Sequence, residues 1–431
     1  MSSPADPVIV VGGGAAGMAV AARLAKAGHP VELHERESGL GGRWRAHEEP
    51  GVGLVDAAPG VLGFPAPWRD LFRKSGRPLE AELARSGHEL APAGPVHYRF
   101  ADGSTLDLPT ERGEQHAALT AAYGEAVAVR WRDLVDGLDE VWQVLRPLGL
   151  EQELRGREQL DRGVRSRLQA RRTLAALAAG TGEPHLQALV RSVAHRHGSS
   201  PERTPAWVAV DLSVSRRFGR WQLRTTRPED PRPDTGRSSV LTETLAARLT
   251  TRRVAVHLDS AVLGVEVVAG RAVAVRTAAG TRPAAAVVVT SDPWELVGDL
   301  LPAGADRSLQ RTVRRLDPAA APTVSHEWRD EPCPEPGETV ELSGAGVPVV
   351  TYRRPVAGGT VSSRHDHGRS RSQPGAGVAW HGFRGWVRRP PVVTGVTGLY
   401  TASPSSPAGG APSPTVLSAA LAAAACQDGL R

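Results

Sequence analysis

Cysteine is scarce in this chain of 431 residues, and long apolar runs are missing. Cys333 and Cys426 stand far apart and form no Cys-x-x-Cys pair, which argues against a dithiol redox mechanism and a cysteine-based zinc site. No segment reaches the roughly 18 apolar residues that a membrane-spanning helix needs, and the N-terminus lacks the pattern of a signal peptide. We therefore expect a cytoplasmic protein, with peripheral contact to a membrane left open.

Lysine is nearly absent as well. Lys26 and Lys74 are the only two, so arginine supplies almost all of the positive charge behind a formal net charge of +6. The arginines are scattered and no nucleic-acid-binding motif accompanies them, so we expect no nucleic-acid partner. An anionic small-molecule substrate stays open, and the oligomeric state is not predicted.

Glycines near the N-terminus form the pattern Gly-x-Gly-x-x-Gly directly after an apolar run at residues 8–11. Gly12 is expected to make a tight turn, Gly14 to let a phosphate approach the backbone, and Gly17 to allow close packing. The pattern predicts a strand and then a helix over residues 15–27, whose N-terminal amides and partial positive charge face a pyrophosphate. A dinucleotide fits this arrangement.

An acidic residue closes the second predicted strand, residues 30–35. Glu35 stands eighteen residues after Gly17, where its carboxylate can accept hydrogen bonds from both ribose hydroxyls. An acid at this place disfavours a 2′-phosphate, so NADP is not expected. Arg43 follows two glycines and adds a second loop on the phosphate side, and together these features point to FAD.

The length of the chain predicts two domains, because one compact core seldom grows this large. The hydrophobic pattern becomes helical between residues 68 and 224, and an α/β pattern returns after a proline-rich loop at 227–236. The other expected elements are helices over 131–145, 171–179, 239–249 and 415–426, β-hairpins over 98–108 and 262–276, and strands over 254–258, 284–290 and 398–400.

Four segments carry a resemblance to a known family. Residues 8–43, Val55-Asp56-Ala-Ala-Pro59, residues 98–104 and residues 254–293 resemble the phytoene (carotenoid) desaturase branch of the flavin amine oxidase superfamily. The resemblance covers nearly the whole chain. It implies an α/β fold, in which a three-layer Rossmann-like FAD-binding domain of the glutathione-reductase type holds an inserted, mixed α+β substrate domain. The implied domains are residues 1–67, 236–300 and 391–431 for FAD binding, and residues 68–235 and 301–390 for the substrate domain, or cap.

The C-terminal region departs from the family pattern. The family has a Gly-x-x-x-x-Pro-Gly-x-Gly loop under the flavin ring and then a helix whose dipole stabilises negative charge on the reduced ring. Here Ser403 stands where glycine is usual, Ala408 replaces another glycine, and Thr415 and Val416 begin the matching helix. The resemblance also implies that Val262 contacts the adenine end of FAD through its backbone. The residues predicted to bind the cofactor are Gly12, Gly14, Ala15, Ala16, Gly17, Glu35, Arg36, Gly42, Arg43, Val262, Ser403, Thr415 and Val416.

The chemistry that the resemblance implies is hydride transfer from a substrate carbon to flavin N5, with the protein supplying orientation and electrostatics. Amine oxidases of this superfamily commonly hold a lysine near N5, and neither lysine lies in the second half of this chain, so a standard amine oxidase is disfavoured. His381 is the candidate acid or base, with simple packing between two tryptophans as the alternative. The triplets His365-Asp366-His367 and His195-Arg196-His197 are interpreted as solvated loops, and no metal site is predicted.

We therefore expect an FAD-dependent oxidoreductase that dehydrogenates or desaturates a small or isoprenoid-like organic substrate. The chain is poor in aromatic residues, and its predicted substrate segments are rich in Arg, Pro and Gly, so a polar or mid-sized substrate is as tenable as a carotenoid. Two alternatives stay open. One is a non-redox isomerase in which FAD stays reduced. The other is a non-catalytic binding protein with a degenerate flavin site, as in the Rab GDP-dissociation inhibitors.

Overall fold

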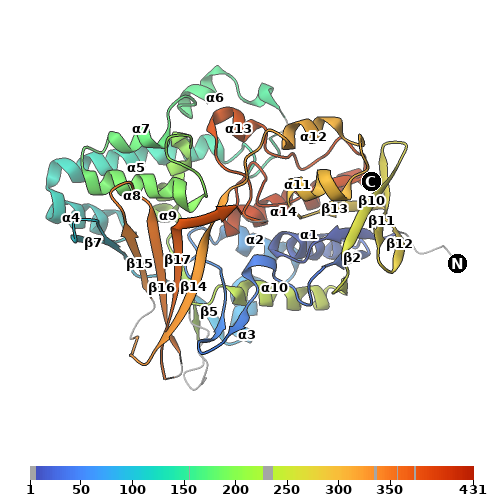
Figure 1. Ribbon diagram of the computed structural model, residues 1–431, viewed down its shortest axis with the longest axis horizontal. Coiled ribbons are helices and arrows are strands. Elements are labelled where there is room, and N and C mark those ends of the chain that lie inside the picture. Colours follow the sequence, from blue (N-terminus) through green and yellow to red (C-terminus); the bar gives the residue numbers. More distant parts are fainter. Residues whose placement is uncertain (1–5, 155, 227–235, 334–336, 357, 373–374) are drawn as a thin grey trace.

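The computed structural model describes residues 6–154, 156–226, 236–333, 337–356, 358–372 and 375–431. The chain forms two parts, a Rossmann-like part built on a parallel sheet and a cap built on a mixed sheet (Figure 1). Within the described residues, no helix combines the length and the apolar character needed to cross a membrane.

Five parallel strands form the centre of the Rossmann-like part. These are β1 (Val8–Val11), β2 (Val31–His34), β9 (Ala255–His257), β13 (Ala286–Val289) and β18 (Leu399–Thr401). Their order across the sheet is β18-β13-β1-β2-β9, and every neighbouring pair is parallel. All residues of β1 and β13 are buried, as expected for valine-rich strands of a parallel sheet covered on both faces.

Helices cover one face of this sheet, and they are α1 (Ala15–Lys26), α2 (Ala66–Ser75), α10 (Ser239–Thr251) and α14 (Pro412–Gly429). Val8 and Val10 of β1 share a hydrophobic core with these helices. Both α1 and α14 are rich in alanine, and the two helices contact each other over the sheet. Small side chains permit this close approach.

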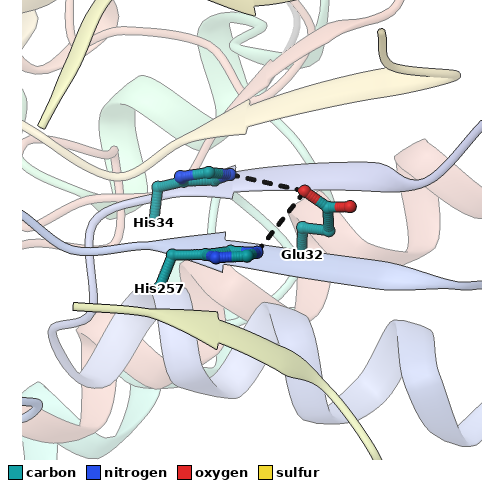
Figure 2. A group of neighbouring side chains, drawn as sticks. All are labelled: Glu32, His34 and His257. Carbon is teal, nitrogen blue, oxygen red and sulfur yellow. Dashed lines mark ion pairs between the residues drawn. The ribbon is translucent and has the colours of Figure 1, made fainter. Parts of the chain in front are cut away.

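A three-stranded antiparallel sheet covers the other face. Its strands are β10 (Val262–Val268), β11 (Arg271–Thr277) and β12 (Gly280–Pro283). Ile9 and Val11 of β1 share a second core with residues of β10 and β11. At the edge of the parallel sheet, His34 of β2 and His257 of β9 are register partners and their rings stack (Figure 2).

The cap contains a six-stranded mixed sheet with the order β14-β17-β16-β15-β6-β7. Long strands descend below the helices at the left of Figure 1. The strands are β6 (Val96–Arg99), β7 (Thr105–Leu108), β14 (Ala320–Arg329), β15 (Gly337–Leu342), β16 (Pro348–Val356) and β17 (Gly359–Ser372). One face packs on helices α4 (Arg112–Tyr123), α5 (Glu125–Leu145), α7 (Leu174–Ala179), α8 (Pro184–Arg196) and α9 (Val210–Phe218) in a third core.

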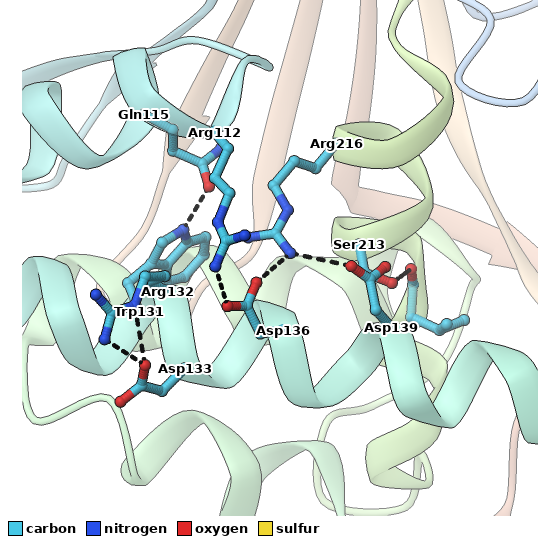
Figure 3. Close-up of polar contacts among 10 residues, drawn as sticks. Arg112, Gln115, Trp131, Arg132, Asp133, Asp136, Asp139, Ser213 and Arg216 are labelled. Atoms are coloured by element: carbon cyan, nitrogen blue, oxygen red, sulfur yellow. Dashed lines mark hydrogen bonds and ion pairs between the residues drawn. The ribbon is translucent and has the colours of Figure 1, made fainter.

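Ion pairs tie three cap helices together (Figure 3). Arg216 of α9 donates to Asp136 at 2.6 Å and to Asp139 at 3.1 Å, both on α5. Arg112 at the start of α4 donates to the other oxygen of Asp136 at 2.5 Å. Because Arg216 is mostly buried while Arg112 is exposed, the α5–α9 contacts are the better shielded half of this network.

Shorter elements connect the two parts. They are β3 (His47–Glu49), β4 (Gly53–Val55), α3 (Leu79–Arg85), β5 (His88–Pro92), α6 (Arg162–Arg167), β8 (Trp221–Thr225), α11 (Pro293–Glu295), α12 (Arg307–Val313) and α13 (Gly382–Val387). Three-residue β3 pairs with β4, and β5 pairs with β8.

The predicted fold class is confirmed: a Rossmann-like, three-layer α/β part carries a mixed α+β cap. The parallel sheet draws its strands from all three stretches that the sequence assigns to FAD binding. However, α2, α3 and Leu223 of β8, which the sequence assigns to the cap, pack in the same core as α1 and α14. Most of the predicted proline-rich loop at 227–236 lies outside the described residues.

Candidate cofactor groove and substrate cavity

A groove of about 740 Å³ lies where the carboxyl ends of β1, β2 and β13 meet the N-terminus of α1. Parallel α/β sheets place their ligand sites at this edge. The groove is lined by Val11, Gly12, Gly14, Ala15, Ala16, His34, Glu35, Arg36, Glu37, Gly39, Gly41, Gly42, Arg43, Trp44, Arg45, His47, Ala57, Ser260, Ala261, Val262, Leu263, Thr290, Ser291, Asp292, Glu295, Gly375, Pro404 and Thr415.

The glycine pattern shapes the floor of the groove. Gly12 has φ +103°, a conformation that glycine adopts readily. A Cβ atom on Gly17 would lie 1.8 Å from the carbonyl oxygen of Gly12, so only glycine lets α1 start this close to β1. Gly14 caps α1 without a side chain, and a Cβ there would meet the Gly42 Cα at 4.0 Å, an ordinary van der Waals contact. The first amides of α1 are therefore left to face whatever occupies the groove.

Glu35 lies just past β2, and it is buried. Its two oxygens accept hydrogen bonds from the backbone N–H groups of Gly13 at 2.6 Å and Glu37 at 2.9 Å. These contacts fix the carboxylate at the groove wall with acceptor capacity to spare. Arg36 is exposed and pairs with Glu295 at 3.2 Å on the groove rim.

Arg43 and Asp292 both line the groove, and their opposite charges interact. Burial lowers the pKa of the Arg43 guanidinium, and the negative charge of Asp292 opposes that shift. Burial likewise raises the pKa of Asp292, against the hydrogen bond from the Gly375 N–H at 2.5 Å and the charge of Arg43. The Oδ1 atom of Asp292 is buried with no hydrogen-bond partner among the described residues. An anionic ligand group beside Arg43 would offset the cost of burying its charge.

Sequence reasoning missed Asp292 as a groove residue, although a signal was present. Asp292 stands three residues after β13, and Glu35 stands one residue after β2. Because both strands are parallel neighbours of β1, their carboxyl ends share one edge of the sheet. Polar residues that follow such strands are candidates for the same site.

The remaining predicted cofactor residues divide into two groups. Val262, at the start of β10, and Thr415 line the groove. Ser403 and Val416 line neither the groove nor the cavity described below. The Ser403 hydroxyl accepts from the Ser405 N–H at 3.2 Å, and Val416 is fully buried in the core beside α1. The side chains of Ser403 and Val416 thus serve the packing of this region.

A second cavity, of about 390 Å³, lies between the groove and the cap, and Arg43, Trp44 and Ala57 line both. Five of the ten tryptophans of the chain line this cavity: Trp44, Trp142, Trp207, Trp380 and Trp386. The chain as a whole is poor in aromatic residues, yet half of its tryptophans gather at this cavity. Tryptophans distant in sequence gather here because α5, the segment before α9 and the segment around α13 share the cap core.

One wall of this cavity is charged. Glu338 of β15 is 4% exposed and accepts from Arg196 at 3.0 Å, while Arg220 binds its other oxygen. Burial alone would raise the pKa of Glu338, but Arg220 and Arg196 outweigh burial and hold it below its usual value. Arg196 lines the cavity, and its side chain keeps 35% of its accessible surface. Two arginines against one glutamate leave this wall with a net positive charge.

Two histidines of β17 belong to the same wall, which corrects the interpretation of residues 365–367 as a solvated loop. Both His365 and His367 line the cavity. Burial lowers the pKa of His365 to about 4 and that of His367 to about 3, and nearby positive groups add to both shifts. The Nε2 atom of His365 is buried without a hydrogen-bond partner among the described residues. Both imidazoles are neutral near pH 7, so His365 can offer this nitrogen to a ligand.

The interpretation of residues 195–197 as a loop is also corrected. His195 and Arg196 are the last two residues of helix α8, and His197 follows it. The carbonyl of His195 accepts from His367 Nδ1 at 3.0 Å, and His197 pairs with Asp211 at 2.7 Å. These residues do not form a metal-binding group among the described residues.

His381 lies outside both the groove and the cavity. It caps α13, and its Nδ1 lies 2.5 Å from Asp317 Oδ2. Trp380 and Trp386, which flank it in sequence, turn inward to the cavity instead. The structure therefore gives the catalytic hypothesis for His381 no support.

The helix after the C-terminal loop begins at Pro412, three residues earlier than predicted. Proline is tolerated in a first helical turn because its missing N–H would have no partner there. Pro412 and Pro414 have no N–H to donate, and the Thr415 N–H is bonded to the Ala411 carbonyl. Among the described residues, the backbone N–H of Ser413 has no backbone acceptor in this turn. The helix dipole still points toward the cavity, with fewer donors than an all-amide turn would present.

Buried Arg389 holds the loop before α14. Its guanidinium donates to the carbonyls of Ser406 at 3.0 Å and Val378 at 2.5 Å, and it stacks 3.9 Å from the ring centre of Trp380. Burial lowers the pKa of Arg389 to about 9. The contacts of the Arg389 side chain therefore hold the loop before α14 in place. The glycine pattern of the family does not predict these contacts.

The sequence of residues 10–75 matches the family described as an NAD(P)-binding Rossmann-like domain. The chain is 38% identical over 146 residues to a phytoene dehydrogenase of Streptomyces griseus, covering 33% of this chain and 27% of that protein. It is 32% identical over 118 residues to a 4,4'-diaponeurosporene oxygenase of Staphylococcus aureus, covering 26% of this chain and 22% of that protein. The matched segments span about a quarter of the length of these curated relatives.

Solved structures are similar over nearly the full chain. Putrescine oxidase bound to putrescine has a TM-score of 0.68 at 13% identity, with 98% of both chains covered. An oxidoreductase from Methanosarcina mazei has a TM-score of 0.66 at 13% identity, covering 96% of this chain and 99% of that one. These full-length likenesses show that the chain shares the fold of the two solved structures.

Proposed function

We propose that this chain is an FAD-dependent oxidoreductase that dehydrogenates or desaturates an organic substrate held in the cap cavity. One observation carries the proposal. The groove and the cavity share Arg43, Trp44 and Ala57, so the two spaces meet. A flavin whose adenosine lies in the groove would therefore face a substrate that lies in the cavity.

The residues of the groove fit FAD. The uncapped first turn of α1 and Arg43 would bind the pyrophosphate, and Glu35 would accept hydrogen bonds from the ribose hydroxyls. The backbone near Val262 would contact the adenine. Each of these groups lines the groove, and Gly14 leaves room for the phosphate to approach.

When bound, FAD supplies the acceptor for a hydride from the substrate. The part of the chain in this reaction is to orient the substrate and to exclude water. The five tryptophans give the cavity large apolar walls, and Phe64 packs edge-on against Trp142 at 5.4 Å between ring centres. His365 would bind a polar group of the substrate through Nε2, which has no partner of its own among the described residues.

The walls of the cavity favour a substrate with an apolar body and one polar end. Phytoene and diaponeurosporene, named in the two relatives, are isoprenoids, and an isoprenoid body suits the tryptophan walls. The positive wall of Arg196 and Arg220 would accommodate a polar or anionic end, which a pure hydrocarbon lacks. We therefore include oxygenated isoprenoids in the proposed substrate class.

The test is anaerobic reduction of the flavin. FAD-loaded protein is mixed with phytoene, farnesol or farnesoic acid, and loss of the oxidised flavin absorbance is followed with time. We expect at least one probe to bleach the flavin, and farnesoic acid to do so faster than the hydrocarbon phytoene. Trp142→Ala should slow bleaching without releasing FAD, whereas Trp328→Ala, an exposed residue of β14, should match the wild type.

Two other outcomes would change the proposal. Conversion of a probe without bleaching and without an electron acceptor would show a non-redox isomerase. A protein that retains FAD and neither bleaches nor converts any probe would contradict the proposed substrate class.

A further inference from the structure

Three metal-ligand side chains meet at the edge of the parallel sheet, beside the groove but outside the flavin chemistry. Glu32 and His34 are two residues apart on β2, so they lie on the same face of the strand. His257 of β9 is the register partner of His34. Figure 2 shows both imidazole rings pointing toward the Glu32 carboxylate.

The distances suit a metal ion. The Nε2 atoms of His34 and His257 each lie 3.5 Å from Glu32 Oε2, and the three ligand atoms lie within 4.8 Å of one another. Two ligand atoms about 2.05 Å from a tetrahedral zinc ion would stand about 3.3 Å apart. The rings stack with their centres 4.5 Å apart, and His257, 38% exposed, has room to turn its nitrogen inward.

The nitrogens at the centre of this cluster face only weakly held partners. Within the described part of the chain neither Nε2 forms a hydrogen bond, and each contacts the Glu32 carboxylate at 3.5 Å as an ion pair. Both nitrogen atoms are buried, and His34 is 4% exposed, so its ring is far from bulk water. A divalent cation between the two nitrogens and the carboxylate oxygen would give all three ligand atoms a strong contact in this buried place.

Outer contacts orient the three ligands. Ser260 Oγ lies 2.9 Å from His34 Nδ1, and Arg282 of β12 donates to Glu32 Oε1 at 2.9 Å and to Oε2 at 3.1 Å. Second contacts of this kind set the orientation of metal ligands. In the metal-free chain, Arg282 neutralises the charge of the Glu32 carboxylate. When Oε2 of Glu32 binds an ion, Arg282 can keep its hydrogen bond to Oε1.

We propose that Glu32, His34 and His257 bind a divalent transition-metal ion, with Zn²⁺ as the best match for two imidazoles and one carboxylate. Water would complete the coordination. The ion would tie β9 to β2 next to the groove, which His34 and Ser260 also line. Its role is structural support of the adenosine end, and this site lies where the sequence predicted none, because His34 and His257 are far apart in the chain.

Zinc binding tests the proposal directly. Protein stripped with EDTA is dialysed against Zn²⁺, and bound metal is measured by elemental analysis. We expect one Zn²⁺ per chain in the wild type, with affinity weakened about tenfold or more in both Glu32→Gln and His257→Asn. His97→Asn is the matched control, since His97 faces Asp107 at 2.6 Å on a cap hairpin, and it should bind like the wild type.

A second measurement protects the test against misfolded variants. Zn²⁺ should raise the thermal midpoint of the wild type and of His97→Asn but not of His257→Asn. Co²⁺ should give visible ligand-field bands, at wavelengths beyond the flavin absorption, in the wild type. The His257→Asn variant should show no such bands. A wild type that binds no Zn²⁺, or variants with unchanged stoichiometry and affinity, would overturn the proposal.

Discussion

The groove and the cavity are built in different ways. Of the 28 described residues that line the groove, 16 lie between residues 11 and 47, and they include Gly12, Gly14 and the start of α1. The cavity is lined by residues of α5, β14 to β17 and the segments around α8, α9 and α13, which lie far apart in the chain. A site drawn largely from one local stretch can be recognised in a sequence, whereas a site drawn from distant segments depends on how strands pair.

Breaking the local backbone of the groove should have the largest effect. In Gly17→Ala the added Cβ would meet the Gly12 carbonyl at 1.8 Å, so α1 must move away from β1. We expect a loss of about 3 kcal/mol or more in the free energy of unfolding. Flavin retention after desalting should fall to background. Denaturant unfolding and flavin absorbance measure the two effects.

A glycine of the cap supplies the control. Gly137 lies within α5 and is exposed, and a Cβ there meets nothing within 4 Å. Gly137→Ala should leave flavin retention unchanged and add about 0.5–1 kcal/mol of stability. Equal behaviour of Gly17→Ala and Gly137→Ala would contradict the packing argument.

Breaking the charged wall of the cavity comes next. Glu338→Gln leaves the charge of buried Arg220 without its partner, while Arg196 keeps 35% of its side chain exposed, so we expect a cost of about 3 kcal/mol, the low end for breaking a buried pair. Glu341→Gln, an exposed change on the same strand, should cost little. Because the folded pKa of Glu338 is lowered, its contribution is present above its unfolded pKa and disappears as the pH falls through the folded value. Urea unfolding across the acid range checks both statements.

The pH dependence of stability tests whether His365 of the cavity is buried as a neutral group. Burial lowers the pKa of His365 from 6.5 to about 4, so the unfolded chain binds its proton first as the pH falls. Stability should therefore be complete above pH 6.5 and decline toward pH 4, by an amount on the order of 3 kcal/mol from this group. His365→Phe should flatten that slope, and His47→Phe, at an exposed position, should not. Identical slopes in the two variants would show that His365 is not buried as a neutral group.

The smallest of the four effects concerns the cofactor alone. Glu35→Ala removes the predicted ribose acceptor, and a lost charged hydrogen bond is worth about 1.5–3 kcal/mol, or roughly ten- to a hundredfold in affinity for FAD. The protein should stay folded. Arg36→Ala, next in sequence and exposed, should change FAD affinity only a few-fold. Titration of FAD into both variants measures these affinities. An unchanged FAD affinity of Glu35→Ala would contradict the role of Glu35 as the ribose acceptor.

The comparison also explains what the sequence can and cannot reveal. Buried valine runs predict β1 and β13 because both faces of a parallel sheet are covered. The segment around His365 is polar and resembles a loop, yet β17 pairs with strands on both sides, and this pairing buries His365. The proline at position 412 looks like a loop residue and instead starts α14.

Long-range geometry likewise hides functional residues. His381 attracts notice between two tryptophans, but the chain turns both rings toward the cavity and leaves the histidine with Asp317. Asp292 attracts little notice and lies on the groove wall. The order of strands in the parallel sheet places Asp292 at the groove, and local pattern alone does not give that order.

The most direct test of the account is the flavin spectrum of the purified protein. The chain is incubated with excess FAD and desalted, and its visible absorbance is recorded before and after denaturation. The account predicts close to one FAD per folded chain, with the spectrum of the bound flavin changing on release. A folded chain that retains no flavin would contradict the central claim and leave a non-catalytic binding protein on this scaffold as the better explanation.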